Sequence, residues 1–301
     1  MVGYEACTLC GHRCGVNRAA GKVGRCGMTS VLRLSRAALH MWEEPPVSGT
    51  RGSGTVCFSG CSLGCIFCQN RDISHGRFGI DVPDSRLSDI FLELQTAGAH
   101  NVNLVTPTHY IPTVRAALRD ARARGLTVPA VYNTSSFDSV DGLRALDGDI
   151  DVYLADLKYM REEIAARLSG ARGYPDVAKA AIAEMVRQKP VPAFDGKGLM
   201  TAGVIVRVLL LPGHVAEAEL AVGYLHKMYG DSIYISLMNQ YTPVGHLPSP
   251  LDRRVTREEY RRLLDYADRI GVSRGFVQAE GTAEESFIPP FDTTGVLPSR
   301  Q

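Results

Sequence analysis

An alternation of apolar runs and amphipathic stretches across residues 55–278 constrains the fold of this chain most strongly. A run such as 203–213 has the length and β-branched content of a buried strand, whereas 215–229 has helical spacing. Thr256 and Glu259 have the spacing of a capping box at the start of the last helix. Strands that alternate with helices predict βα units and a mostly parallel sheet. We therefore expect an α/β fold, a complete or partial barrel with its functional groups at the carboxyl ends of the strands.

The alternation also divides the chain into three parts. An irregular Cys- and Gly-rich extension covers 1–54, the barrel covers 55–278, and a tail without a clear period covers 279–301. The extension ends in a possible hairpin and a Pro/Gly-rich connector. We expect Ser88 to cap the first long helix. The expected strands are 55–60, 101–106, 127–134, 151–158, 203–213, 232–240 and 275–278, and the expected helices are 88–98, 111–124 (ending at Gly125), 141–148, 160–189 (broken near Gly170–Pro175), 215–229 and 256–271.

Charge and hydropathy exclude several classes of function. The chain of 301 residues has 33 Lys and Arg against 32 Asp and Glu, so no excess charge points to nucleic acid or to an anionic membrane. Its apolar runs are too short to span a bilayer, and its first residues lack the apolar stretch of a secretory signal. We expect a cytoplasmic protein.

All eight cysteines lie within the first 68 residues. A disulfide framework would connect the whole fold and is typical of secreted chains. Cysteines crowded at one end of a cytosolic chain indicate metal sites instead.

Cys61, Cys65 and Cys68 follow the first expected barrel strand with the spacing C-x3-C-x2-C. Three thiolates on one loop can ligate three irons of a cubane and leave the fourth iron open, whereas structural Fe–S and zinc sites normally use four ligands. An open iron can bind a cofactor or a substrate. The alternatives are a zinc site and a redox-sensing cysteine cluster.

The motif Cys61-x3-Cys65-x-Phe67-Cys68 resembles that of the radical S-adenosylmethionine (SAM) superfamily. The resemblance implies a partial (βα)6-type barrel, a [4Fe-4S] cluster that binds SAM, and a flavodoxin- or ferredoxin-type electron donor. SAM would be cleaved to a 5′-deoxyadenosyl radical, with Phe67 near the adenine. Over about residues 7–290 the chain also resembles the pyruvate formate-lyase activating enzyme-like group, through CxLC-x3-CGVNR, EEPP-x-SGT-x-GSGT, FSGC-x3-C-x2-CQN, VTPTHY, SLMNQYTP and RGFVQ.

The resemblance also suggests a SAM pocket at the strand ends. Where the superfamily often has Gly-Gly-Glu, this chain has Thr106-Pro107-Thr108-His109, so backbone carbonyls or the two Thr hydroxyls would accept from the SAM ammonium. Asp156 and Lys158 share one side of their strand and resemble a pair that contacts SAM in glycyl-radical-enzyme activases. The remaining candidates are Asn133 and Ser135 for the ribose or methionine moiety, and Arg207 and His214 for the SAM carboxylate.

A second set of cysteines, with the spacing C-x2-C-x3-C-x11-C, lies in the extension: Cys7, Cys10, Cys14 and Cys26. Four thiolates can close a metal site. The gaps fit a zinc ribbon poorly, since such ribbons pair two C-x2-C units. We expect a second [4Fe-4S] cluster, with zinc as the alternative.

Further polar residues are expected in the loops at the barrel mouth. Tyr241 could relay a hydrogen atom or a proton, and Glu44 could bind a substrate amine. Cys57 lies inside the first strand and is expected to be a buried apolar residue.

The leading hypothesis is a radical SAM enzyme that abstracts hydrogen from a small-molecule or peptide substrate. One alternative is an activase that installs a glycyl radical on a partner enzyme. Another alternative is a non-enzymatic zinc-binding interaction module.

Overall fold

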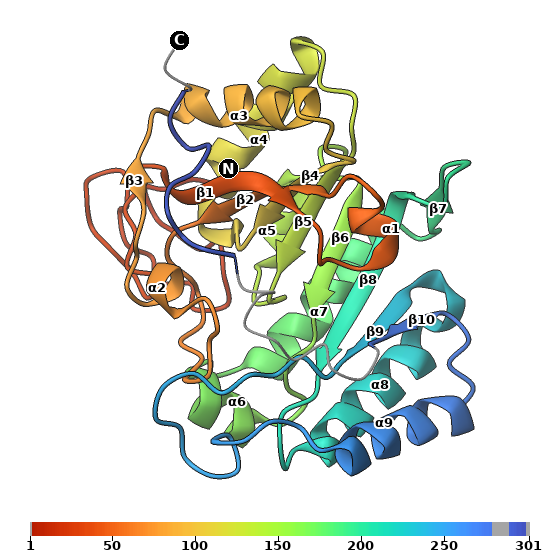
Figure 1. The fold of residues 1–301 in the computed structure, drawn as a ribbon. Helices are drawn as coiled ribbons and strands as arrows, with labels where there is room; N and C mark the ends of the chain where they lie inside the picture. Colours follow the sequence, from red (N-terminus) through yellow and green to blue (C-terminus); the bar gives the residue numbers. More distant parts are fainter. Residues whose placement is uncertain (1, 279–288, 299–301) are drawn as a thin grey trace.

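The central sheet is built mainly from parallel strands, as the alternation predicts (Figure 1). The computed structural model describes residues 2–278 and 289–298. The sheet has the order β10-β9-β8-β6-β5-β4-β2-β1-β3, and every pair from β2 to β10 along this path is parallel. These parallel strands are β2 (Ser53–Phe58), β4 (Val102–Val105), β5 (Ala130–Thr134), β6 (Val152–Asp156), β8 (Met200–Leu209), β9 (Tyr234–Met238) and β10 (Gly275–Val277).

Helices connect consecutive parallel strands and cover the outer face of the sheet (Figure 1). Within the described residues β10 pairs with neither β1 nor β3, so the sheet is open. The α/β class and the partial form of the barrel are thus confirmed. The longer helices are α3 (Asp84–Thr96), α4 (Ile111–Ala123), α5 (Val140–Ala145), α6 (Glu162–Ser169), α7 (Tyr174–Gln188), α8 (Val215–Tyr229) and α9 (Arg257–Arg269).

Several predictions about helix ends are confirmed and one is wrong. The capping box at α9 is present, and Gly125 follows α4 with a positive φ of 104°. The N-cap assigned to Ser88 is wrong, because α3 begins at Asp84 after Pro83 and Ser88 is buried inside the helix. Proline before the first turn and an acidic residue within it suit a helix N-terminus, where amide groups lack partners.

The expected hairpin in the extension is instead one strand, β1 (Arg33–His40), paired antiparallel with β2. The sequence-based boundary at residue 55 therefore lies inside β2. The connector contains α1 (Pro45–Ser48). The remaining short elements are α2 (Arg71–Ser74), β3 (Ile80–Asp81), η1 (Thr108–Tyr110), β7 (Ala193–Phe194) and η2 (Gly230–Ser232).

Residues 2–31 form no helix or strand, as expected for the Cys-rich segment. This segment lies against the loop after β5, where the Gly11 amide donates to the Phe137 carbonyl at 3.0 Å and the Ser139 amide donates to the Leu9 carbonyl at 3.0 Å. The described part of the expected tail lies along β1, where the Ala37 amide donates to the Thr294 carbonyl at 2.8 Å. The rest of the tail, 279–288 and 299–301, falls outside the described residues.

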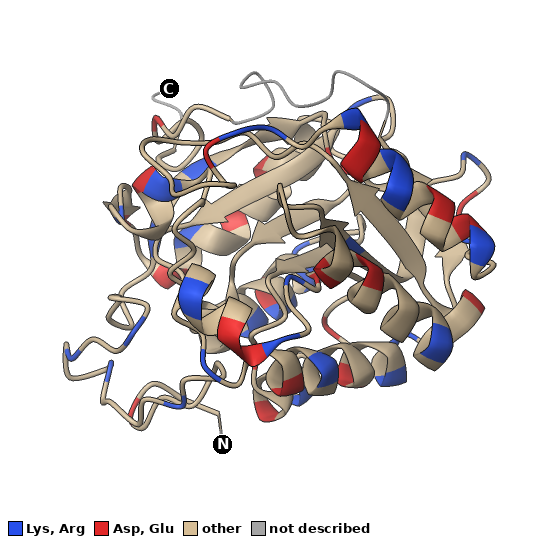
Figure 2. Cartoon of the chain, turned by 90° about the horizontal axis from the view of Figure 1, so that it is seen from below, with Lys and Arg blue, Asp and Glu red and all other residues tan. Residues whose placement is uncertain are grey.

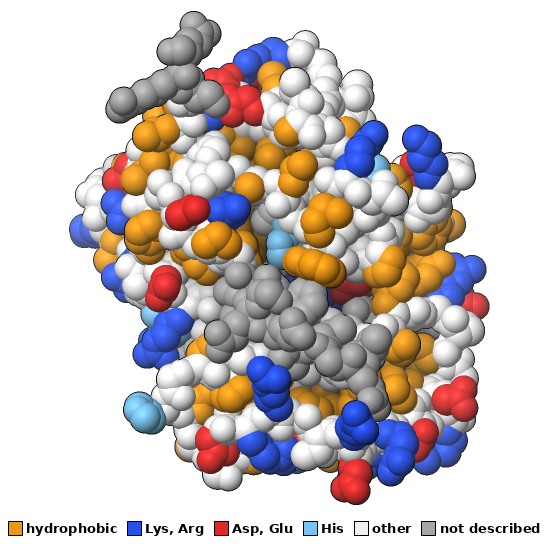
Figure 3. All heavy atoms as spheres, viewed as in Figure 1, with side chains coloured by type: hydrophobic (Ala, Val, Ile, Leu, Met, Phe, Trp, Pro, Cys, Tyr) orange, Lys and Arg blue, Asp and Glu red, His pale blue; other side chains and the backbone are white. Residues whose placement is uncertain are grey.

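Acidic and basic residues are mixed along the outer helices rather than separated into regions of one sign (Figure 2). The face in Figure 3 likewise mixes apolar side chains with charges of both signs. None of the described helices is both long and apolar enough to cross a bilayer.

Candidate functional site

The three cysteines of the C-x3-C-x2-C motif lie in the loop that leaves the carboxyl end of β2. Gly60 opens this loop with a φ of +84°. Cys65 is buried, whereas Cys61 and Cys68 are partly exposed. Each sulfur accepts one hydrogen bond, as expected for sulfurs whose negative charge must be stabilised. The donors are the Leu63 amide to Cys61 at 3.4 Å, the Ser169 hydroxyl to Cys65 at 2.9 Å and the Ser74 hydroxyl to Cys68 at 3.2 Å.

The three cysteines line one cavity of about 440 Å³. Loops at the carboxyl ends of β2, β4, β5, β6 and β8 contribute to its wall, which is where ligands bind in folds built from βα units. A volume of this size falls within the range of about 300–1,000 Å³ that is usual for small-molecule sites. The sequence-predicted residues on the wall are Cys61, Cys65, Phe67, Cys68, Thr106, Asn133, Ser135, Asp156, Lys158, Arg207 and Tyr241.

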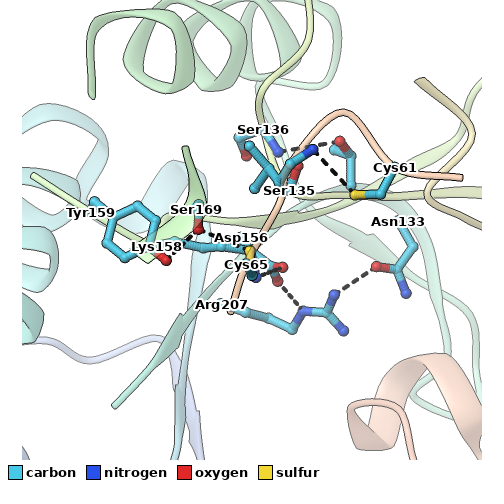
Figure 4. A network of polar contacts seen from close by, with 12 residues as sticks. Cys61, Cys65, Asn133, Ser135, Ser136, Asp156, Lys158, Tyr159, Ser169 and Arg207 are labelled. Atoms are coloured by element: carbon cyan, nitrogen blue, oxygen red, sulfur yellow. Dashed lines mark hydrogen bonds and ion pairs between the residues drawn. The ribbon is translucent and has the colours of Figure 1, made fainter. Parts of the chain in front are cut away.

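A network of charged side chains forms the part of the wall beside Cys65 (Figure 4). Asp156 accepts from Lys158 Nζ at 2.7 Å and from Arg207 Nε at 2.8 Å. Arg207 also pairs with Glu43 at 3.1 Å and donates to Asn133 Oδ1 at 2.6 Å. The lone charge in the fifth apolar run is therefore balanced by two carboxylates from other parts of the chain.

The ion pairs of Asp156 with Arg207 and Lys158 shift the pKa values of the groups in the site. Burial raises the pKa of Asp156, but Arg207 and Lys158 outweigh burial and hold this pKa below its ordinary value. Burial lowers the pKa of Lys158, but the charges of Asp156 and Cys65 leave it above its ordinary value. Burial raises the pKa of the Cys65 thiol to about 11, against the opposing effect of Lys158. Lys158 is therefore a cation close to Cys65, suited to stabilise negative charge on its sulfur.

Two aromatic residues of the wall contact each other. The rings of Phe67 and Tyr241 pack edge to face, with centroids 6.1 Å apart. The Tyr241 hydroxyl donates to the Leu251 carbonyl at 2.6 Å, and burial raises the Tyr241 pKa to about 12. Any relay through this hydroxyl would first have to break the bond to Leu251.

Two of the predicted SAM ligands do not line the cavity. Thr108 is buried behind the wall, within 3.5 Å of the Thr134 hydroxyl. His214 precedes α8, where its Nδ1 lies 2.8 Å from the Pro212 carbonyl and its Nε2 lies 3.3 Å from Arg167. Thr106 does reach the wall, and a φ of 60° turns the chain there.

The N-terminal cysteines form a separate group. Cys7, Cys10 and Cys26 are buried, Cys14 is exposed, and none of the four lines the cavity. The four thiols are close enough to interact electrostatically, since the other three all contribute to raising the pKa of Cys10. Burial is the larger cause and takes the pKa of Cys10 to about 12. Cys57 is buried in β2, as expected.

No three His, Cys, Asp or Glu side chains in the described part of the chain are already arranged to hold a metal ion. Metal binding at either cysteine set would therefore draw the sulfurs together. At the first set the residues still suit a cubane and SAM, because three hydrogen-bonded sulfurs, an ammonium, a guanidinium and a carboxylate share one cavity.

Sequence reasoning missed several residues of this site. Ser169 is separated from Cys65 by 104 positions, and no local pattern connects them. Glu43 was not predicted to belong to the site, although the acidic pair Glu43-Glu44 and the lone charge of Arg207 within an apolar run were a usable signal. Glu44 itself is buried and does not line the cavity, with its Oε2 lacking a hydrogen-bond partner among the described residues.

Comparison with solved structures agrees with the fold described above. A radical SAM methyltransferase from Sphaerobacter thermophilus superposes with a TM-score of 0.53 at 18% identity, over 76% of this chain and 67% of that chain. The chain has the fold of a radical SAM enzyme. Streptococcus suis SuiB bound to SAM gives a TM-score of 0.49 at 12% identity, over 74% of this chain. The chain spans about half of SuiB, at 49% of its length.

Sequence comparison finds a relative whose activity is itself not described. An uncharacterised protein of Methanocaldococcus jannaschii is 29% identical over 281 residues, which cover 89% of this chain and 76% of the relative. No protein-family model matches the chain.

Proposed function

We propose that this chain is a radical SAM enzyme that cleaves SAM reductively and abstracts hydrogen from a small-molecule or peptide substrate. One observation carries the proposal: Cys61, Cys65 and Cys68 share the wall of a single cavity with charged side chains from the ends of neighbouring parallel strands. Three thiolates would hold a [4Fe-4S] cluster and leave one iron for SAM.

The charged wall suits the methionine end of SAM, which carries both an ammonium and a carboxylate. Asp156 would accept hydrogen bonds from the ammonium, while Lys158 and Arg207 would meet the carboxylate. Asp156, Lys158 and Arg207 now pair with one another. Ion pairs with SAM would replace these pairs, so that no buried charge would be left without a partner.

The chemistry supplied by a bound cluster is one-electron reduction of SAM, which releases methionine and a 5′-deoxyadenosyl radical. A flavodoxin- or ferredoxin-type protein would deliver the electron. The side chains of the cavity would bind and orient SAM and shield the site of radical formation from water. Leu63 and Phe67, each 5% exposed, line the cavity beside the cysteines and keep water from the site of radical formation.

The mouth of the cavity favours direct chemistry on a small or extended substrate. Pro289 and Pro290, far along the chain, lie on the cavity wall together with residues of β1. The cavity of about 440 Å³ has the size of a small-molecule site rather than of a surface for a folded partner. The second candidate, an activase for a glycyl radical enzyme, is favoured by Asp156 and Lys158, which match the pair expected from the resemblance.

The experiment is electron paramagnetic resonance of the anaerobically reconstituted, reduced protein with and without SAM. We expect a cubane signal that changes when SAM binds at the open iron. Cys61→Ala should lose the SAM-sensitive signal, whereas the matched control Cys57→Ala, a buried cysteine outside the motif, should keep it. A SAM-insensitive signal, or none in the wild type, would contradict the proposal. A glycyl radical on a protein partner would instead support the activase.

A further inference from the structure

The N-terminal segment contains a buried guanidinium that lacks an acidic partner. The Arg18 side chain belongs to a residue that is 1% exposed. Its Nε donates to the Met28 carbonyl at 2.9 Å, its Nη2 to the Thr29 carbonyl at 2.6 Å and its Nη1 to the His109 carbonyl. Among the described residues, no carboxylate lies within ion-pair distance of Arg18.

The groups around this guanidinium point to a counter-charge on sulfur. Arg18 Nη1 lies 3.8 Å from Cys7 Sγ, and Arg18 also interacts electrostatically with Cys26. The rings of Tyr4 and Tyr110 face the guanidinium at 5.0 and 5.5 Å, which adds favourable quadrupole interactions but no net charge. Arginine stays protonated in proteins, and a buried charge is costly unless it is paired. Neutral thiols do not balance it, whereas metal-bound thiolates do.

We propose that Cys7, Cys10, Cys14 and Cys26 hold a metal centre of net negative charge, that Arg18 balances this charge, and that the centre fixes the loop carrying Cys61. The inference rests on the proposed function only in treating Cys61 as a ligand of the radical cluster. Burial of three of the four sulfurs and their distance from the cavity wall suit a closed, structural centre.

Contacts from the segment reach the loop at Ser59, Gly60 and Ser62. Arg18 holds the backbone of His109, and His109 Nε2 donates to the Ser59 carbonyl at 2.8 Å. His12, between two of the cysteines, donates from Nε2 to the Ser62 carbonyl at 2.8 Å.

The third contact is the close packing of Gly60 against the N-terminal segment. A Cβ at Gly60 would lie 2.3 Å from Met28 Cγ and 3.0 Å from the Cys26 carbonyl oxygen. The residue before Cys61 is therefore pressed directly onto the segment that carries the last N-terminal cysteine. Loss of the metal centre would release Arg18 and the segment that carries the four cysteines, and with that segment the three contacts that hold the start of the cluster loop.

Zinc with four thiolates and a cubane with four thiolates both carry a net negative charge, so the charge of Arg18 fits either. The first experiment is metal analysis of the Cys61→Ala/Cys65→Ala/Cys68→Ala variant, which lacks the radical site. We expect about one zinc or about four irons per chain, lost when Cys10→Ser is added. A variant without metal, beside a wild type that still loads one cubane, would overturn this inference and leave the proposed function intact. Metal in the variant beside a wild type that loads no iron would leave this inference intact and overturn the proposed function.

The second experiment is hydrogen exchange of the same triple variant, metal-loaded and stripped by a chelator. We expect removal of the metal to raise amide exchange in residues 59–64 by about tenfold, while β5 stays protected. Equal exchange in 59–64 in the two states would overturn the coupling.

Arg18→Met in the full chain tests the counter-charge. We expect loss of the N-terminal metal or raised exchange in 59–64. The matched control is Arg13→Met, which removes an exposed arginine of the same segment and should change neither. An Arg18→Met protein that keeps its metal and its protection would overturn the role of Arg18. If Arg18→Met also exposes β5, the chelator comparison decides.

Discussion

The two cysteine groups of this molecule are close in sequence but differ in their surroundings. The group at Cys61, Cys65 and Cys68 lies at the carboxyl edge of the parallel sheet and faces a cavity with several charged side chains. The group from Cys7 to Cys26 lies in an irregular segment, mostly buried and away from that cavity. Three thiols beside an open cavity suit a reactive cluster, whereas four thiols away from the cavity suit a structural centre.

The difference also shows in the charges that face each group. Cys65 has the Lys158 cation nearby, and this cation is in turn paired with Asp156, so the local charge can rearrange when a ligand enters. Cys7 has Arg18, whose other partners are backbone carbonyls and cannot take its charge. The ion pair beside Cys65 can be exchanged for contacts with a ligand, whereas the position of the Arg18 charge beside Cys7 is fixed.

The largest predicted effect separates the two groups by activity. Cys68→Ala should reduce 5′-deoxyadenosine formation to background, because the cluster loses one of its three ligands. Cys14→Ala, at the exposed member of the other group, should lower the rate by only about tenfold, because Cys14 does not line the cavity and its loss acts on the reaction indirectly. Initial rates under strictly anaerobic conditions measure both. Equal loss of 5′-deoxyadenosine formation in the two variants would contradict the view that only the cysteines of the C-x3-C-x2-C motif take part in the chemistry.

The sequence predicted the regular parts of the fold well. The limits of α8 match the predicted 215–229, and the capping box at Thr256 is present, because both depend on local spacing. The assignment of Ser88 failed because Pro83 and Asp84 offered an earlier start of the same helix. The pairing of β1 with β2 is a tertiary contact, and the spacing of its apolar residues does not reveal it.

The candidate site was predictable only in part for the same reason. The cysteines, Asp156, Lys158 and Arg207 were found because they follow or interrupt recognisable strands. Ser169 and Arg18 act through contacts between distant segments, so no spacing rule marks them. His214 follows a strand as the other candidates do, yet it lies at the start of α8 and not on the cavity wall.

The second prediction tests the exchangeable charges through stability. Arg207→Met leaves Asp156 and Glu43 with one fewer partner in a partly buried site, which should cost about 3 kcal/mol of unfolding free energy. The matched control is Arg253→Met, which breaks a more exposed pair with Glu259 and should cost about 1 kcal/mol or less. Urea unfolding measures both, and similar losses would show that the wall is no more than a surface ion-pair network.

A third, smaller effect is on acid stability. Because the folded pKa of Asp156 is held below its ordinary value, its contribution is complete above about pH 4 and is lost as pH falls through the folded pKa. Arg207→Met removes the main cause of the depression, so the variant should lose less stability than the wild type as pH falls below about 4, and the two curves should converge. Unfolding free energy measured from pH 6 downward tests this, and parallel curves would contradict it.

The smallest predicted effect concerns one hydrogen bond to sulfur. Ser169→Ala removes the hydroxyl that donates to Cys65, so the reduced cluster loses stabilisation and its potential should fall, with little change in iron content. The control Tyr159→Phe keeps the Ser169 hydroxyl and removes its other partner, so it should change the potential less. A redox titration of the reconstituted proteins compares them. An unchanged potential in Ser169→Ala would show that this contact does not reach the cluster.

The most direct test of the account is the fate of SAM. Wild-type protein reconstituted with iron and sulfide, reduced with dithionite and mixed with SAM should form 5′-deoxyadenosine and methionine, quantified by chromatography. The account predicts this product in the wild type and its absence in Cys65→Ala. A fully reduced cubane that leaves SAM intact, or equal product from Cys65→Ala, would contradict it.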